Sequence, residues 1–148
     1  MRLPYPPLAA LLFATLSHSA AQAAEAQVAV AANFAEPIKA IAAVLEKTTG
    51  HTLKITLGST GKLFAQIRNG APFDMLLAAD AKTPEALEKD GLTQPGSRFT
   101  YATGKLVLWS AKAGRVDDQG AVLKAADLGK VAFAAPKVAP YGAAAVEA

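Results

Sequence analysis

The chain has 148 residues, no cysteine and a formal net charge of +3. The lack of cysteine excludes disulfides, thiolate metal sites and a cysteine nucleophile. Its 15 lysines and arginines are scattered rather than gathered into a basic stripe with interleaved aromatic residues, which argues against a nucleic-acid partner.

Residues 1–24 are predicted to be a secretory signal rather than part of the fold. Arg2 supplies a positive charge, residues 8–16 an apolar segment, and residues 21–23 a small-x-small cleavage site. The apolar segment is shorter than the roughly 20 residues that span a bilayer. We therefore expect export and removal of the first 23 or 24 residues, which leaves a soluble mature chain.

Residues 27–91 predict three strands that alternate with three helices. Each predicted strand is a short apolar or alternating run, and the first helix shows apolar residues at i, i+3, i+4 and i+7. Asn33 and Glu36 form a capping-box pattern before the first helix, and Asp80 precedes the third helix. The predicted strands are residues 27–32, 52–57 and 73–79. Strand and helix in alternation predict an α/β fold with a mostly parallel sheet and helices on both faces.

The rest of the chain predicts a loop, two more strands and a last helix. Pro95 and Gly96 indicate a turn, and Trp109 and Tyr101 are expected to pack rather than to stack on a ligand. The predicted elements are a strand at 105–110, a short helical piece within 116–128, a strand at 131–134 and a helix after Pro140.

Small hydrogen-bonding residues lie where strands lead into helices: Asn33, then residues 58–61, then residues 140–142. Helix starts carry unpaired N–H groups and partial positive charge, so several directed at one point would bind an anion. The carboxyl ends of parallel strands meet at one edge of a sheet, where such folds bind ligands. The plainer alternative is that Asn33 and Thr60 simply cap their helices.

Enzymatic alternatives find less support in the sequence. Residues 58–63 lack the spacing of a nucleotide-binding P-loop, and the Ser59-x-x-Lys62 pattern lacks the other elements of a serine acyl-enzyme. Asp74 and Asp80 flank an apolar run and could form a carboxylate pair, but a turn residue and a helix cap explain them better. His51, the one histidine beyond the signal, has no metal-binding neighbours.

Several segments together resemble the periplasmic molybdate-binding proteins of ABC transporters. They are the Ala-Ala-Asn start at 31–33, the Gly-Ser-Thr-Gly-Lys-Leu segment at 58–63, the Gly-Ala-Pro to Ala-Asp segment at 70–80, and residues 136–142. The resemblance covers nearly all of the chain beyond the signal.

This resemblance implies a two-lobed fold of the second periplasmic-binding-protein type, with residues 25–104 as the first lobe and 105–148 as the start of an incomplete, truncated second lobe. It places Asn33, Ser59, Thr60 and the backbone of Tyr141 around a tetrahedral oxyanion. It implies molybdate or tungstate as ligand, with molybdenum held only as the oxyanion, no cofactor, no catalytic residue and no direct protein–metal bond. It also implies a monomer in the periplasm that delivers the anion to an inner-membrane permease.

Three alternatives stay open from the sequence. The anion could be another one, such as sulfate or a small carboxylate; the chain could be an inactive fragment; or it could be a secreted hydrolase that uses Ser59 and Lys62 or the two aspartates. Because the family's remaining ligands lie in a C-terminal half, we expect the 148-residue chain alone to bind molybdate weakly or not at all.

Overall fold

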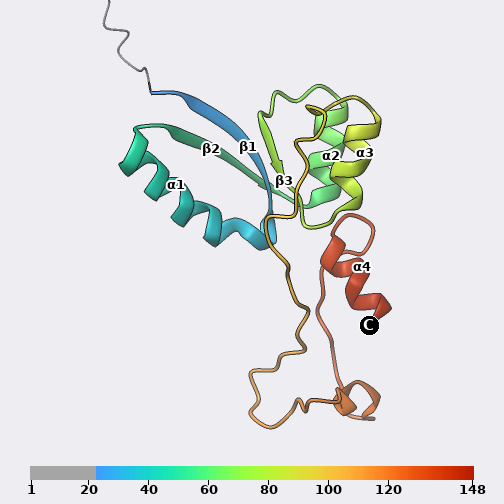
Figure 1. Ribbon diagram of the computed structural model, residues 1–148. Helices are drawn as coiled ribbons and strands as arrows, with labels where there is room; N and C mark the ends of the chain where they lie inside the picture. The colour runs from blue at the N-terminus through green and yellow to red at the C-terminus, as the bar shows by residue number, and fades with distance from the viewer. Residues whose placement is uncertain (1–22) are drawn as a thin grey trace, which may run out of the picture.

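The structure is a computed structural model that describes residues 23–148 (Figure 1). Nearly all of the predicted signal thus lies outside the described residues. Strands β1 (Glu25–Ala31), β2 (Thr52–Gly58) and β3 (Met75–Leu77) form one sheet in the order β2-β1-β3, and both strand pairs are parallel. In the part of the chain that the structure describes, no helix is both long and apolar enough to cross a membrane.

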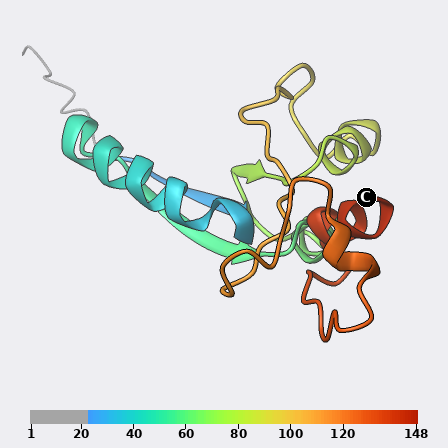
Figure 2. The same cartoon turned by 90° about the horizontal axis from the view of Figure 1, so that it is seen from below.

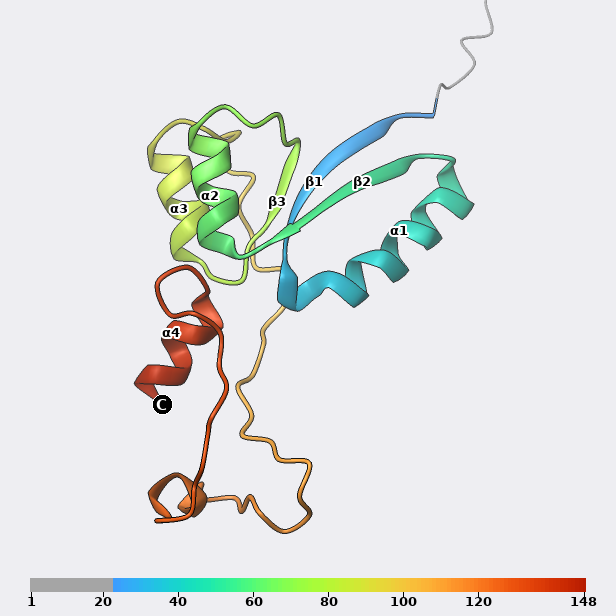
Figure 3. The same cartoon turned by 180° about the vertical axis from the view of Figure 1, so that it is seen from behind.

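Helices cover both faces of this sheet, as predicted. Helix α1 (Ala35–Thr49) links β1 to β2 on one side, and α2 (Thr60–Arg68) links β2 to β3, across β1, on the other. Right-handed crossovers that run in opposite directions must place their helices on opposite faces. Figures 2 and 3 show α1 apart from α2 and from α3 (Lys82–Lys89), which pack together.

The core lies between β1 and its neighbours because β1 is the central strand. Val28 and Val30 are fully buried and pack with Ile38 of α1. Helix α1 ends at Gly50, whose positive φ of 75° is easily reached only without a side chain, and whose N–H closes the helix on the Glu46 carbonyl at 2.9 Å. Local signals of this kind define where the strands and helices of residues 25–91 begin and end.

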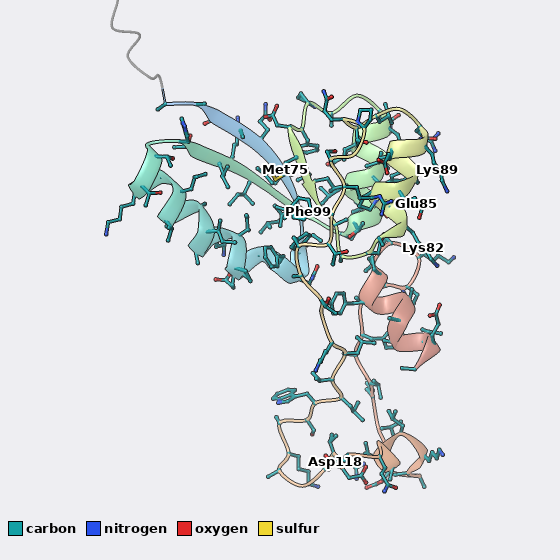
Figure 4. The ribbon with its side chains drawn as sticks, viewed as in Figure 1. Met75, Lys82, Glu85, Lys89, Phe99 and Asp118 are labelled. Atoms are coloured by element: carbon teal, nitrogen blue, oxygen red, sulfur yellow. The ribbon has the colours of Figure 1, made fainter. Side chains whose placement is uncertain are left out.

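The predicted capping box at Asn33 is wrong. Residues Ala32–Phe34 form a 3-10 turn, η1, so Asn33 lies within a helical turn, and Phe34 occupies the position before α1 without a side-chain cap. Glu36 pairs instead with Lys39 at 2.6 Å on the exposed surface. The third strand is also shorter than predicted and half open, since Met75 is 54% exposed. Figure 4 shows Met75 on β3, and Lys82, Glu85 and Lys89 on α3.

The strands predicted at 105–110 and 131–134 are also wrong. Residues 99–139 are irregular, and their middle part runs away from the sheet (Figure 1). They contain one 3-10 helix, η2 (Ala121–Lys124), inside the range 116–128 where a short helical piece was predicted. A strand exists only where another strand completes its hydrogen bonds, and neither segment pairs with one among residues 23–148. Trp109, expected to pack, is 77% exposed.

The excursion has its own short network at its far end, where Figure 4 marks Asp118. Arg115 bonds to the Asp127 carboxylate at 2.9 Å and to the Asp127 carbonyl at 2.7 Å. The Arg115 guanidinium holds the pKa of the Asp127 carboxyl below its usual value by hydrogen bonding and charge. Both arms of the excursion between this network and the sheet stay without regular structure.

The exposed apolar side chains of residues 105–110 predict self-association. Val107 is 82% exposed beside Trp109, and an unpaired β-prone segment can pair with another copy. We expect Val107→Lys to lower the apparent molecular mass at high protein concentration in light scattering. Val146→Lys, a change on an exposed helical valine, is the matched control and should leave association unchanged. Equal effects of both changes would contradict a role for the segment.

The helix predicted after Pro140 is confirmed as α4 (Pro140–Glu147). The residues before it bring the chain back to the start of α2, where the Val138 carbonyl accepts from the Gly61 N–H. Figures 1 and 3 show α4 beneath α2 and α3. Its N-terminal residues therefore arrive near the carboxyl ends of the strands.

Candidate anion-binding site

The carboxyl edge of the sheet brings the predicted site residues into one region. Parallel pairing sets Ala31 at the end of β1 opposite Gly58 at the end of β2, so Asn33 and Ser59 follow neighbouring strand ends. With the order β2-β1-β3, the chain leaves β1 and β3 toward helices on opposite faces. Such a switch point opens a crevice between the two strand ends, where open α/β sheets bind ligands.

Ser59 has a buried hydroxyl with no protein partner. Its Oγ is inaccessible and makes no hydrogen bond within the described residues, although Ser59 is the residue before α2 and could have capped that helix. A buried hydroxyl left unpaired costs about 1–3 kcal/mol. The position therefore favours a ligand that accepts a hydrogen bond from this hydroxyl.

Thr60, the first residue of α2, is 1% exposed. Its Oγ1 accepts a hydrogen bond from the Ala79 N–H at 3.0 Å, just past the end of β3. Thr60 thus ties the start of α2 to the β3 exit instead of capping its own helix. The alternative in which Asn33 and Thr60 serve as simple side-chain caps is wrong for both residues.

The start of α2 is also where the returning chain docks. The Gly61 N–H, in the first turn of α2, donates to the Val138 carbonyl at 3.1 Å. A Cβ at Gly61 would lie 3.1 Å from that oxygen, so a side chain there would crowd this contact. The helix end keeps its partial positive charge, because a helix dipole is not cancelled by one neutral acceptor.

A cavity of about 280 Å³ lies between the β3 exit and α4. Tyr141 is the one predicted site residue that lines it, and its ring lies against Gly104, where a Cβ would overlap the hydroxyl. The lining residues are Ala79, Asp80, Gly104, Leu106, Pro140, Tyr141 and Ala144. A larger hollow of about 410 Å³, on the surface of α2 at Phe64 and Arg68, holds no predicted site residue.

The four predicted residues are therefore placed unequally. Ser59 and Thr60 are held at the start of α2, and Thr60 reaches the cavity wall through Ala79. Asn33 is exposed on η1, next to the same edge, and does not line the cavity. The cavity itself is lined by the β3 exit, by residues 104 and 106 and by α4, and Ser59 and Thr60 do not line it.

Tyr101 is a part of this region that the sequence did not mark as functional. Its ring meets Phe34 edge to face with centroids 5.0 Å apart, and its hydroxyl donates to the Ala78 carbonyl at 2.8 Å. Burial raises the pKa of the Tyr101 hydroxyl, and nearby Tyr141 adds to the shift. The expected packing role of Tyr101 is confirmed, but its partners are far away in sequence and gave no local signal.

The carboxylates have structural partners. The Asp74 carboxylate accepts a hydrogen bond from the Gln27 N–H of β1 at 2.7 Å and so links the chain before β3 to β1. The Asp80 carboxylate accepts from the Thr83 N–H at 2.6 Å, in the first turn of α3. Groups of three or more His, Asp or Glu side chains suited to a metal ion do not occur in residues 23–148. The arrangement suits neutral donors to an anion better than acid–base chemistry.

Comparisons with known proteins agree with this fold. The profile described as bacterial extracellular solute-binding protein matches residues 26–148. The molybdate-binding protein ModA of Azotobacter vinelandii is 61% identical over 140 residues, which cover 95% of this chain and 56% of the relative. ModA of Rhodobacter capsulatus is 56% identical over 127 residues, covering 86% of this chain and 50% of the relative.

A solved structure extends the comparison to three dimensions. The Azotobacter vinelandii periplasmic molybdate-binding protein superposes with a TM-score of 0.79 at 48% identity, covering 82% of this chain and 53% of that one. The predicted periplasmic-binding-protein fold is thereby confirmed. The chain spans about half the length of the relatives it matches. By profile, sequence and structure, it belongs to the bacterial extracellular solute-binding proteins.

Proposed function

We propose that this chain belongs to an exported, periplasmic receptor that captures molybdate, or its congener tungstate, and delivers it to an ABC transporter of the inner membrane. The relatives at 61% and 56% identity are named molybdate-binding proteins, which supports the choice of anion. In this proposal the protein is a monomer that binds and releases its ligand without chemical change. It needs no cofactor, because the anion itself is the cargo.

One observation carries the proposal: the Ser59 Oγ is buried and unpaired at the start of a helix. A tetrahedral oxyanion would accept from this hydroxyl, from the Thr60 hydroxyl and from first-turn N–H groups of α2 other than those of Gly61 and Leu63, which already donate to protein carbonyls. Each neutral donor to a charged acceptor contributes about 1.5–3 kcal/mol. Neutral donors also allow release, since no fixed cation holds the dianion.

Selection of molybdate over sulfate would depend on size. Both anions are tetrahedral and accept hydrogen bonds only, so the donor set alone does not separate them. A ring of fixed donors measures the distance between anion oxygens, and molybdate is the larger anion. A sulfate receptor is the second candidate, but the names of both close relatives favour molybdate.

The proposal is tested by calorimetry on a chimera. The part of the Azotobacter vinelandii relative beyond the aligned region is joined to residue 148, so that this chain contributes Asn33, Ser59, Thr60 and Tyr141. We expect molybdate and tungstate to bind at least about 100-fold more tightly than sulfate or phosphate. Tighter binding of sulfate would overturn the assignment.

The Ser59→Ala change tests the observation behind the proposal. Removing one donor to a charged acceptor should weaken molybdate binding by about 10- to 100-fold. The stability of the unliganded protein should rise by up to about 1–3 kcal/mol, because the change removes a buried hydroxyl that has no protein partner. Ser97→Ala is the matched control, since the Ser97 hydroxyl bonds to the Gln94 carbonyl at 2.7 Å in a distant exposed loop. Unchanged affinity in the Ser59 variant would remove this residue from the site.

A further inference from the structure

A single peptide group at the β3 exit is held by side chains at both of its ends. The Ala78 carbonyl accepts from the Tyr101 hydroxyl at 2.8 Å, and the N–H of the same peptide group, on Ala79, donates to the Thr60 Oγ1 at 3.0 Å. Ala78 is 8% exposed and Thr60 1%. Three hydrogen-bonding groups therefore form a chain that runs from Tyr101 to Thr60.

The chemistry of the peptide group fixes the direction of both hydrogen bonds. A peptide carbonyl can only accept and a peptide N–H can only donate, so the Tyr101 hydroxyl must be the donor and the Thr60 oxygen the acceptor. The Thr60 hydrogen is then directed away from Ala79. Within residues 23–148 no protein acceptor receives that hydrogen.

We propose that Tyr101 is a positioning residue that, through the Ala78–Ala79 peptide group, makes Thr60 a hydrogen-bond donor to the bound oxyanion. Tyr101 does not touch the anion. Its hydroxyl polarises the peptide group, which strengthens the Ala79 N–H as a donor to Thr60. Its ring also fixes Phe34, the residue after Asn33, at 5.0 Å between centroids, so both exits at the crevice are held by one side chain.

The consequence is selectivity by hydrogen-bond type, which rests on the proposed function. The Thr60 oxygen already accepts from the Ala79 N–H, which leaves its hydrogen as the group best placed to meet a ligand and favours anions that only accept, such as molybdate and sulfate. Hydrogen phosphate carries an O–H that needs an acceptor, and the Thr60 oxygen is less available to accept it because one lone pair is taken by the Ala79 N–H. A polar group left unpaired in a closed site is expensive, so the site disfavours this ligand.

The first test needs no anion. In Tyr101→Phe, which keeps the ring and removes the hydroxyl, amide exchange measured by NMR in this chain should be at least about threefold faster at Ala79. Exchange at Val30, in the centre of the sheet, should be unchanged. Phe99→Leu, at a 79% exposed ring in the same loop, is the control and should leave both amides unchanged. Equal exchange at Ala79 in Tyr101→Phe and in the unaltered chain would overturn the proposed link from Tyr101 through the peptide group to Thr60.

The second test is a double-mutant cycle with molybdate and phosphate, in the chain and in the chimera described above. Tyr101→Phe should lower molybdate affinity about three- to tenfold and narrow the preference over phosphate. In a Thr60→Val background the same change should cost nothing further, because Tyr101 acts through Thr60. Additive losses would show a general structural role and reject the proposal. If neither protein binds molybdate, the proposed function fails, and the exchange at Ala79 still decides whether Tyr101 acts on Thr60 through the peptide group.

Discussion

Gly142→Ala is expected to destabilise the protein by about 1–3 kcal/mol, the range for an overpacked interior. Gly142 is buried in α4, and a Cβ there would overlap the Ala134 carbonyl oxygen and lie 2.9 Å from the Ala135 carbonyl carbon. These are backbone atoms, so no side-chain rotation relieves the overlap. Helix α4 must move, and the contact between Val138 and Gly61 at the start of α2 moves with it.

The sign of this effect is informative because helix propensity predicts the opposite. In an unobstructed helix, glycine to alanine stabilises by about 1 kcal/mol. Urea unfolding of Gly142→Ala measures the difference, and amide exchange at Gly61 reports whether α4 has left the site. Ala145→Gly, at an exposed position of the same helix, is the control and should show the ordinary propensity loss. A stabilised Gly142→Ala would mean that α4 is not docked as described.

The three strand-helix units could be predicted from sequence because their signals are local. The alternating run at 52–57, the apolar period of α1 and the Asn69-Gly70 stop of α2 each depend on neighbours within a few residues. The order β2-β1-β3 follows from the fold family rather than from any of these signals. The predicted ends of the first two strands agree with the structure closely enough that Ser59 and Thr60 lie at the same edge of the sheet as Asn33.

The two strands predicted beyond residue 104 failed for a physical reason. Residues 105–110 have strong β-propensity, but propensity does not supply a partner, and a strand needs another strand beside it. Whether a polar side chain caps a helix also depends on more than the spacing of residues in the sequence. Asn33 and Glu36 match a capping box in spacing, yet Asn33 lies inside the 3-10 turn at Ala32–Phe34, one residue before the N-cap position of α1.

The site shows the same division between local and distant information. Ser59 and Thr60 were predicted from a local motif, and the structure adds that the Ser59 hydroxyl is buried without a partner and that the Thr60 hydroxyl accepts from the Ala79 N–H. The contacts of Tyr101 were not predicted, because its partners, Phe34 and Ala78, lie 67 and 23 residues away in the chain. Only the folded arrangement shows that one tyrosine contacts both Phe34, which follows β1, and Ala78, which follows β3.

Thr60→Val is expected to weaken oxyanion binding about 10- to 100-fold and to lower stability by about 1–2 kcal/mol. Valine keeps the volume of this 1% exposed side chain, so the packing at the start of α2 is retained. It removes the acceptor of the Ala79 N–H, which then faces the half-buried cavity wall unpaired. It also removes the donor that we assign to the anion, so the two losses arise from one oxygen.

Thr60→Ser separates these losses from side-chain shape, because serine keeps the hydroxyl and lacks the methyl group. We expect calorimetry with molybdate to give nearly unchanged affinity for Thr60→Ser and a large loss for Thr60→Val in the chimera. Urea unfolding should rank Thr60→Ser above Thr60→Val, since only serine can still accept from Ala79. If Thr60→Val binds as tightly as the unaltered protein while its stability falls, Thr60 holds the β3 exit in place and does not bind the anion. Equal losses of affinity in both variants would mean that the site tolerates neither change of side-chain shape, because valine keeps the methyl group and serine keeps the hydroxyl, and would leave no specific role for the hydroxyl.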